Sequence, residues 1–258
     1  MTQVKLGDKN IPFVYQGNNL LYPNPIKSGL MLWVDFKGLN NNSYNRNKAF
    51  NFANNSLDSK LNNFSYTEGS GYKDGLQFDG IDDFISFNDL TINDFEGKEE
   101  FTFDFTITFT NSNKRGAVFC LPITLPNDGS KRLLVKVTEN KEIAIGRFNG
   151  AWKGKKTLPI DKQKVNVVMT FKGMEGADFN VRAYVNGVSW DLSVSSVSAS
   201  EYYGNPYAHL IIGWQGTNSQ PEIAFLKEII HSAKIYNRIL TDQEIQHNYK
   251  LEKERWGL

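Results

Sequence analysis

Hydrophobic and polar residues alternate strictly along residues 101–110, FTFDFTITFT. Phe101, Phe103, Phe105, Ile107 and Phe109 occupy every second position, with threonine or aspartate between them. A period of two over this length predicts a β-strand with one face in a hydrophobic core and the other in water. Other apolar or alternating stretches predict further strands at 30–36, 116–121, 132–138, 142–148, 165–171, 179–185, 209–214 and 222–236.

Turn and cap residues complete the pattern. Asn186-Gly187, within VRAYVNGVSWDL, suits a two-residue hairpin turn because both residues tolerate positive φ. Only the C-terminal residues follow a helical pattern: Thr241 and Glu244 form a capping box, and Ile245 follows at helical spacing. The chain is therefore predicted to be all-β, an antiparallel sandwich or barrel with one short C-terminal helix.

Two segments differ from this pattern. In residues 1–28, short apolar pieces are broken by glycine, Asn-Asn and two prolines, which predicts an N-terminal arm or small hairpin used for attachment. Residues 29–258 are then one domain, a length that a single β-sandwich can reach. Within it, the Asn-rich stretch 38–63 is typical of a long surface excursion.

Composition narrows the set of partners. The formal net charge of +1 gives no bulk field to attract nucleic acid. Cys120 is the single cysteine, so neither an intrachain disulfide nor a cysteine-based zinc site is expected. The N-terminus lacks the apolar core of a secretion signal, and the chain has no long apolar run. We therefore expect no nucleic-acid or membrane partner, and synthesis in a reducing cytoplasm without a signal peptide.

Three stretches resemble the concanavalin A-like lectin/glucanase superfamily, and within it the laminin-G-like jelly-roll domains. They are GLQFDGIDDFISF at 75–87, VRAYVNGV at 181–188 and LKEIIHSAKIYNRILTDQEIQHNY at 226–249. The resemblance implies two antiparallel sheets packed face to face, with carbohydrate binding, adhesion or, in some branches, glycoside hydrolysis as the function. The start of the chain, up to VDF at 34–36, resembles tail or baseplate proteins of phages that infect Gram-positive bacteria.

Asp79, Asp82 and Asp83 surround Gly80 in the first of these stretches. Glycine and aspartate favour a turn, and the carboxylates of a tight turn also suit Ca²⁺, which takes six to eight oxygens. Catalysis would need two carboxyl groups facing one sugar ring. The Glu-x-Asp-x-x-Glu arrangement of the superfamily's hydrolytic branch does not occur, which makes hydrolysis the poorer interpretation. A turn is favoured, and a calcium site is the alternative.

Aromatic residues on loops are typical of sugar binding, because a ring stacks on the apolar face of a pyranose. Two stretches flanking the predicted strand 209–214 carry such rings with amide neighbours: Tyr202, Tyr203, Tyr207, Trp214, Gln215 and Asn218. The alternative is that these rings pack against the sandwich edge or an oligomer contact.

Trp152 is a further candidate, within RFNGAWKGKK at 147–156. It is surrounded by Arg147, Lys153, Lys155 and Lys156, and a ring beside cations suits an anionic polymer such as a teichoic acid. A merely solvated lysine-rich loop is the alternative. The three histidines have no second ligand at zinc spacing.

The sequence as a whole predicts a non-enzymatic module that binds a carbohydrate or cell-wall polymer. The arm's resemblance implies a virion component of a phage tail or baseplate that contacts the host surface and joins other tail proteins through residues 1–28. A homo-oligomer is compatible with this role. The alternatives are a purely structural virion protein, whose aromatic loops are protein interfaces, and a glycoside hydrolase.

Overall fold

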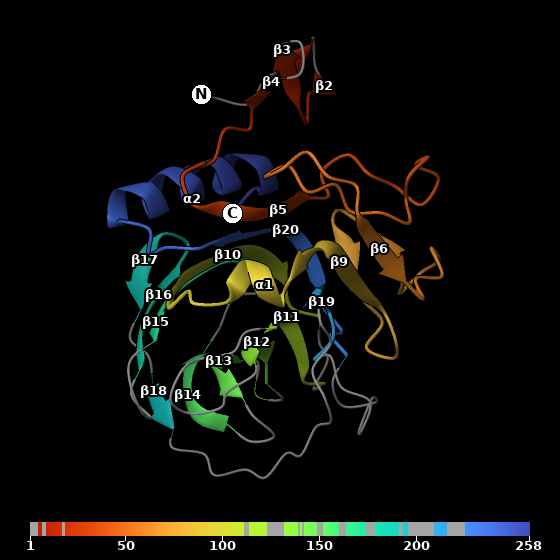
Figure 1. Cartoon of the computed structure of the whole chain (residues 1–258). Coiled ribbons are helices and arrows are strands. Elements are labelled where there is room, and N and C mark those ends of the chain that lie inside the picture. The colour runs from red at the N-terminus through yellow and green to blue at the C-terminus, as the bar shows by residue number, and fades with distance from the viewer. Residues whose placement is uncertain are drawn as a thin grey trace.

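Two large antiparallel sheets face each other, and a C-terminal helix lies on the outer face of one of them (Figure 1). This arrangement confirms the predicted all-β sandwich with a short C-terminal helix. The computed structural model describes residues 5–6, 9–16, 19–110, 114–122, 132–138, 140, 142–148, 152–159, 164–173, 179–190, 193–195, 209–215 and 225–258.

The first sheet consists of β5 (Leu30–Asp35), β7 (Gly71–Tyr72), β8 (Leu76–Gln77), β10 (Glu100–Thr108), β15 (Lys164–Gly173), β16 (Phe179–Val185), β17 (Val188–Trp190) and β20 (Ile229–Tyr236). Its strand order is β17-β16-β15-β10-β20-β8-β7, and β5 also pairs with β20. The β16–β17 hairpin turns at Asn186 and Gly187, whose φ values of 50° and 74° confirm the predicted turn.

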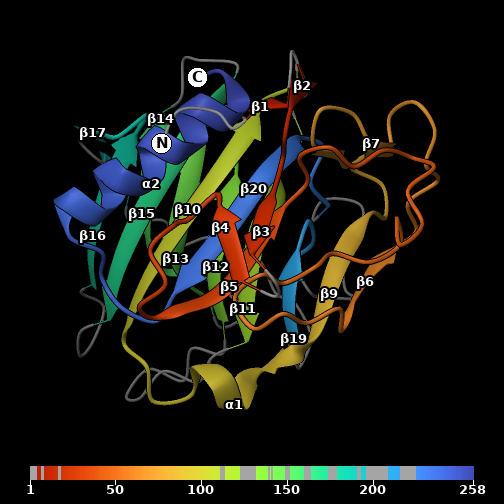
Figure 2. The same cartoon turned by 90° about the horizontal axis from the view of Figure 1, so that it is seen from above.

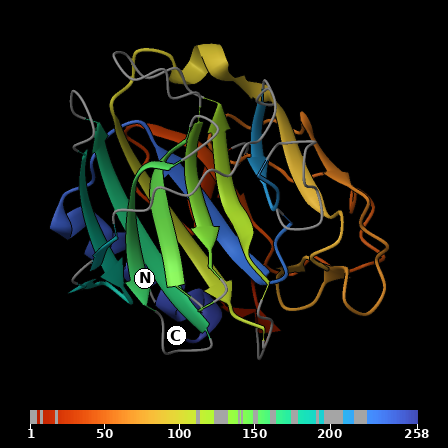
Figure 3. The same ribbon diagram turned by 90° about the horizontal axis from the view of Figure 1, so that it is seen from below.

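The second sheet consists of β6 (Ser59–Asn62), β9 (Phe84–Thr91), β11 (Gly116–Pro122), β12 (Arg132–Val137), β13 (Glu142–Phe148), β14 (Trp152–Pro159), β18 (Ser193–Ser195) and β19 (His209–Ile212). Its order is β18-β14-β13-β12-β11-β19-β9-β6, and Figure 3 shows this sheet from below. A one-turn helix, α1 (Ile92–Phe95), follows β9 and was not expected from the sequence.

The core lies between the sheets, as the alternation in 101–110 predicts. Phe101, Phe103 and Phe105 have no exposed surface. Phe119 of β11 packs edge-on against Phe105, with ring centroids 5.5 Å apart. Each such side chain contributes about 1.5–3 kcal/mol on burial, which makes this row a main source of stability.

The polar face of β10 corrects one expectation. Thr102, Asp104 and Thr106 were expected to face water, but all three have no exposed surface. Helix α2 (Asp242–Trp256) covers this face of the sheet, as Figure 2 shows from above. The alternation therefore predicted the strand correctly, but its polar positions face a helix and not solvent.

Helix α2 begins and ends where its cap residues predict. The backbone N–H of Glu244 donates to Thr241 Oγ1 (3.3 Å), and the N–H of Thr241 donates to Glu244 Oε2 (2.9 Å). Gly257 ends the helix in the left-handed region at φ 68°. No helix within the described residues has the length and apolar character needed to cross a bilayer.

The N-terminal arm is made of β1 (Lys5–Leu6), β2 (Lys9–Asn10), β3 (Val14–Gln16) and β4 (Asn19–Tyr22), and it projects beyond α2 (Figure 1). β1 pairs with β2 and β3 with β4, and neither pair joins the large sheets. Among the described side chains of the arm, Leu6 (76% exposed), Tyr15 (51%) and Leu21 (44%) are exposed apolar residues. Its attachment to the domain includes a contact between His247 Nε2 and the carbonyl of Asn24 (2.9 Å).

Three other boundaries differ from expectation. The Asn-rich stretch 38–63 is mostly turns, but it ends in β6, which pairs with β9. The final strand begins at Ile229, whereas a strand over 222–236 was expected. A lysine-rich loop is the alternative for the basic stretch 147–156, but its residues 152–156 belong to β14 and pair with β13, which fixes their backbone in a sheet.

Candidate functional site

The turn between β8 and β9, residues 79–83, holds the three aspartates of the FDGIDD motif. Asp79 Oδ1 accepts hydrogen bonds from the backbone N–H groups of Ile81 (2.7 Å) and Asp82 (3.3 Å). The N–H of Asp79 donates to Oδ2 of Asp83 (3.0 Å). Gly80 has φ +73°, which glycine adopts without strain. These bonds confirm that the motif forms a turn.

The same turn concentrates negative charge. One carboxylate oxygen from each of Asp79, Asp82 and Asp83 lies within 4.8 Å of the others. Asp82 is exposed, whereas Asp83 is fully buried and its Oδ1 has no hydrogen-bond partner. Burial raises the pKa of Asp83 to about 7, the charges of the other two aspartates add to the rise, and the Ser70 hydroxyl opposes it. A set of hard oxygen donors of this kind fits Ca²⁺.

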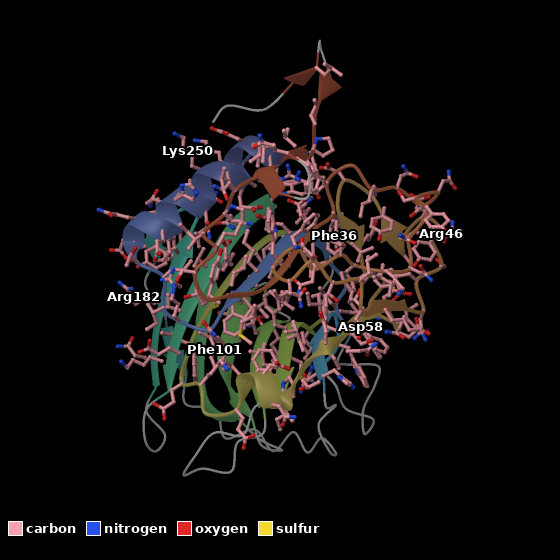
Figure 4. All side chains as sticks on the ribbon, turned by 45° about the horizontal axis from the view of Figure 1, so that its top comes forward. Phe36, Arg46, Asp58, Phe101, Arg182 and Lys250 are labelled. Carbon is pink, nitrogen blue, oxygen red and sulfur yellow. The ribbon has the colours of Figure 1, made fainter. Side chains whose placement is uncertain are left out.

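Loops beside this turn carry groups that the sequence did not single out. The Arg46 guanidinium lies 4.6 Å from the Tyr66 ring centroid, and the hydroxyls of Tyr66 and Tyr72 both donate to the Arg46 carbonyl (3.0 and 2.9 Å). Tyr44 is 98% exposed. Figure 4 shows Arg46 at the outer edge of these loops. The signal that would have found them is the aromatic and basic pair inside the amide-rich NNSYNRN at 41–47.

The Asp turn and these loops are neighbours. Asn63 Nδ2 donates to the carbonyl of Asp82 (2.9 Å), and the charge of Asp83 contributes to the raised pKa of Tyr66, for which burial is the main cause. We call Tyr44, Arg46, Tyr66 and the three aspartates the acidic rim. It combines the exposed ring of Tyr44, the half-buried ring of Tyr66, a cation and carboxylates, which are groups that can bind sugar hydroxyls and pyranose faces.

Trp214 and Gln215 are buried, with 6% and 3% of their surface exposed. The Trp214 ring stacks on Phe225 with centroids 5.6 Å apart and an interplanar angle of 8°, and it also contacts Phe84 (5.0 Å). The Gln215 carbonyl accepts a hydrogen bond from Cys120 Sγ (3.3 Å). Both side chains are therefore packed into the second sheet's outer layer, which supports the packing alternative for this stretch.

The remaining predicted ligand residues are described only in part. Tyr202, Tyr203, Tyr207 and Asn218 lie outside the described residues. The backbone of Trp152 lies on β14 opposite Phe148 of β13. Their roles in ligand binding stay predictions.

Comparison with known proteins yields matches at the level of structure. No protein-family model matches the chain, and no curated protein matches it in sequence. Trypanosoma rangeli sialidase in complex with 2,3-difluorosialic acid matches with a TM-score of 0.51 and 17% identity, over 88% of this chain and 34% of the sialidase. The receptor-binding domain of botulinum neurotoxin C/D mosaic serotype matches with a TM-score of 0.51 and 12% identity, over 87% of this chain and 52% of that one.

The likeness is one of fold. At these identities it shows the fold alone, a two-sheet β-sandwich, and transfers no individual residue. The chain spans about a third of the sialidase and about half of the toxin chain, as the covered shares of 34% and 52% state.

His231 offers a test of how the first sheet responds to pH. Its Nε2 hydrogen-bonds with Thr108 Oγ1 (2.7 Å), and its ring lies 4.8 Å from that of Trp256. Burial lowers the pKa of His231 to about 4, the charge of Lys164 adds to this, and Asp74 opposes it. The unfolded chain therefore binds a proton that the folded chain excludes, so this histidine removes stability as the pH falls from about 6.5 to 4.

We expect the free energy of unfolding of the wild type to fall relative to that of His231→Gln as the pH is lowered from about 7.5 to 5. The expected change in this difference is about 2 kcal/mol. Urea unfolding at the two pH values measures it. Asp83 has the opposite sign, because its raised pKa favours the folded state at low pH, so only the difference between variants isolates His231. The exposed His247→Gln is the control, and an equal pH response in both variants would contradict the assignment.

Proposed function

We propose that the chain is a non-enzymatic module that binds a carbohydrate or cell-wall polymer. The observation that carries this proposal is the sandwich fold, which 88% of the chain shares with part of a sialidase solved with a sialic acid derivative. The second neighbour, at 87% coverage, is a receptor-binding domain. Binding surfaces in such a fold lie on the loops that join the strands.

Two groups of described carboxylates, the buried pair near α2 and the acidic turn, do not suit hydrolysis. Glycosidases need two carboxyl groups that reach one sugar ring, about 5–5.5 or 6.5–9.5 Å apart. Asp104 of β10 and Glu252 of α2 are buried between the sheet and the helix, where a sugar has no access. In the acidic turn, Asp79 Oδ1 is occupied by two backbone N–H groups and Asp83 is fully buried, which leaves Asp82 as the exposed acid.

We further propose that the module works in a phage tail or baseplate, with the arm as its attachment to other tail proteins. The two short antiparallel strand pairs of the arm expose Leu6, Tyr15 and Leu21, and exposed apolar side chains suit a protein contact. The arm is held to the domain at two places: the Ile26 N–H donates to Asn248 Oδ1 (3.0 Å), and the Phe13 ring stacks on Phe52 with centroids 4.9 Å apart. The sandwich loops then stay available for the host surface.

Pull-down with purified Gram-positive cell walls and their isolated polymers tests this function. We expect saturable binding without release of reducing ends. Tyr202→Ala is expected to weaken binding by about two- to tenfold if the predicted loop forms the site, since loss of a stacked ring is worth about 0.5–1.5 kcal/mol. Tyr44→Ala is the matched variant in the acidic rim. The variant that binds the polymer more weakly shows which of the two loops contacts it.

Two outcomes would contradict the proposal. Release of reducing ends that is lost in an acid variant would establish a glycoside hydrolase. Absence of binding to every polymer, together with assembly that Tyr15→Asp abolishes, would establish the purely structural role. Tyr15 is 51% exposed on the arm, so this substitution changes the surface and not the core.

A further inference from the structure

The acidic turn brings three carboxyl groups close together. No ion pair joins a described cationic side chain to Asp79, Asp82 or Asp83. The ammonium group of Lys114 reaches this turn, but it donates to the carbonyl of Gly80 (3.0 Å). Elsewhere in the domain, the buried carboxylate of Asp35 pairs with Arg255 at 2.8 Å.

A second observation points into the turn. Asp83 has no exposed surface, and its Oδ1 has no hydrogen-bond partner, whereas its Oδ2 accepts from the N–H of Asp79. Buried carboxylate oxygens are normally satisfied by donors or by a metal ion. The Oδ1 atom of Asp83 is therefore a buried, unsatisfied oxygen beside two further carboxyl groups.

We propose that Asp79, Asp82 and Asp83 bind a calcium ion. One carboxylate oxygen from each already lies within 4.8 Å of the other two, a separation that a single ion can bridge. The inference goes beyond the proposed function and does not depend on it.

The donor set selects the class of ion. Among the described residues this is the one group of ligating side chains, and it contains oxygen donors with no histidine or cysteine, which disfavours zinc and the softer transition metals. Ca²⁺ accepts irregular geometry and six to eight oxygens, whereas Mg²⁺ requires a near-ideal octahedron. Asp82 is exposed, so the remaining coordination positions face solvent and are open to water or to ligand oxygens.

The ion would join two parts of the acidic rim. The carbonyl of Asp82 accepts from Asn63 Nδ2 (2.9 Å), and Ser65 N–H donates to Ser70 Oγ (3.0 Å) in the loop whose Ser70 lies beside Asp83. Calcium on the three carboxylates therefore fixes the β8–β9 turn against the loop of residues 63–70. Removal of the ion would loosen the rim while leaving the sandwich core intact.

Titration of the chelator-treated full chain with Ca²⁺ in a calorimeter tests the site. We expect saturable binding of one ion, a rise in melting temperature of several degrees, and Tb³⁺ luminescence excited through tyrosine, because Tyr66 lies beside the turn. Asp82→Asn is expected to weaken Ca²⁺ binding by at least tenfold, and Asp82 is exposed, so its melting temperature in EDTA should match the wild type.

Glu68→Gln is the control, because Glu68 is an exposed acid of the neighbouring loop outside the acidic turn, and it should bind Ca²⁺ like the wild type. Asp79→Asn is the second variant; its amide oxygen keeps the acceptor for Ile81 while the charge is lost. Absence of saturable binding up to about 10 mM Ca²⁺, a level beyond even weak extracellular calcium modules, would overturn the proposal. Binding that both aspartate variants leave unchanged would overturn it equally. Because the probe is the ion alone, neither result depends on sugar binding.

Discussion

Replacement of Lys234 by methionine is expected to destabilise the protein by about 3–5 kcal/mol, because it leaves two buried carboxylates without a cation. Lys234 Nζ lies 2.6 Å from Glu252 Oε1 and 3.5 Å from Asp104 Oδ2, and all three side chains are at most 2% exposed. Burial alone would lower the pKa of Lys234, but the charges of Asp104 and Glu252 outweigh it and hold that pKa above its ordinary value. The ammonium is therefore charged beneath α2 at every physiological pH.

Urea unfolding of Lys234→Met measures the effect, with Lys172→Met as the matched control. Lys172 is 2.8 Å from Glu100 on the same sheet, but its side chain is 52% exposed, so its loss should cost less than about 1 kcal/mol. Adding Glu252→Gln to Lys234→Met removes one of the two unpaired buried charges and should restore part of the stability. Equal effects of the two lysine substitutions would show that the buried network does not hold α2 to the sheet.

Replacement of Arg255 by methionine is expected to cost a similar amount, about 3–5 kcal/mol, and to release the arm as well. The Arg255 guanidinium donates from Nε and Nη2 to the two oxygens of Asp35, both at 2.8 Å. Its Nη1 donates to the carbonyl of Pro12 (2.6 Å), and the group lies 4.9 Å from the Phe13 ring centroid. One side chain thus joins α2, β5 and the arm, and its loss leaves Asp35 buried without a cation.

Hydrogen exchange and urea unfolding measure both consequences. In Arg255→Met, amides of residues 9–16 should exchange faster than in the wild type, in addition to the loss of global stability. Arg182→Met is the control, because Arg182 pairs with Asp242 at 3.2 Å on the surface and its side chain is 49% exposed. Unchanged exchange in the arm would contradict the role of Arg255 as its anchor.

Features set by neighbouring residues in the chain could be predicted from the sequence. The capping box of α2, the Asn186-Gly187 turn and the Asp turn all depend on hydrogen bonds across a few residues, and all three are observed. Burial of the polar face of β10 could not be predicted, because it depends on Glu252 and Asn248, more than a hundred residues further along the chain. Asn248 Nδ2 donates to Asp104 Oδ2 at 3.0 Å, and a strand with alternating threonines contains no sign of that partner.

The candidate site also contains features that could be predicted from the sequence and features that could not. The three aspartates are close in sequence, so their grouping was predictable, whereas the unsatisfied oxygen of Asp83 depends on how the surrounding loops pack. The sequence predicts Trp214 as a sugar-stacking residue because it lies among amides and a glycine. Its burial is decided by Phe225 and Phe84, and a pattern of neighbours cannot show that.

The central claim is that this sandwich recognises a carbohydrate. Binding of the purified full chain to an array of glycans and Gram-positive wall polymers, run in parallel with Ca²⁺ and with EDTA, tests it most directly. We expect saturable binding to one chemical class of polymer. The comparison of Ca²⁺ with EDTA shows whether the acidic turn takes part in this binding. Absence of binding to every glycan and polymer in both conditions would contradict carbohydrate recognition and would favour a structural role based on the arm.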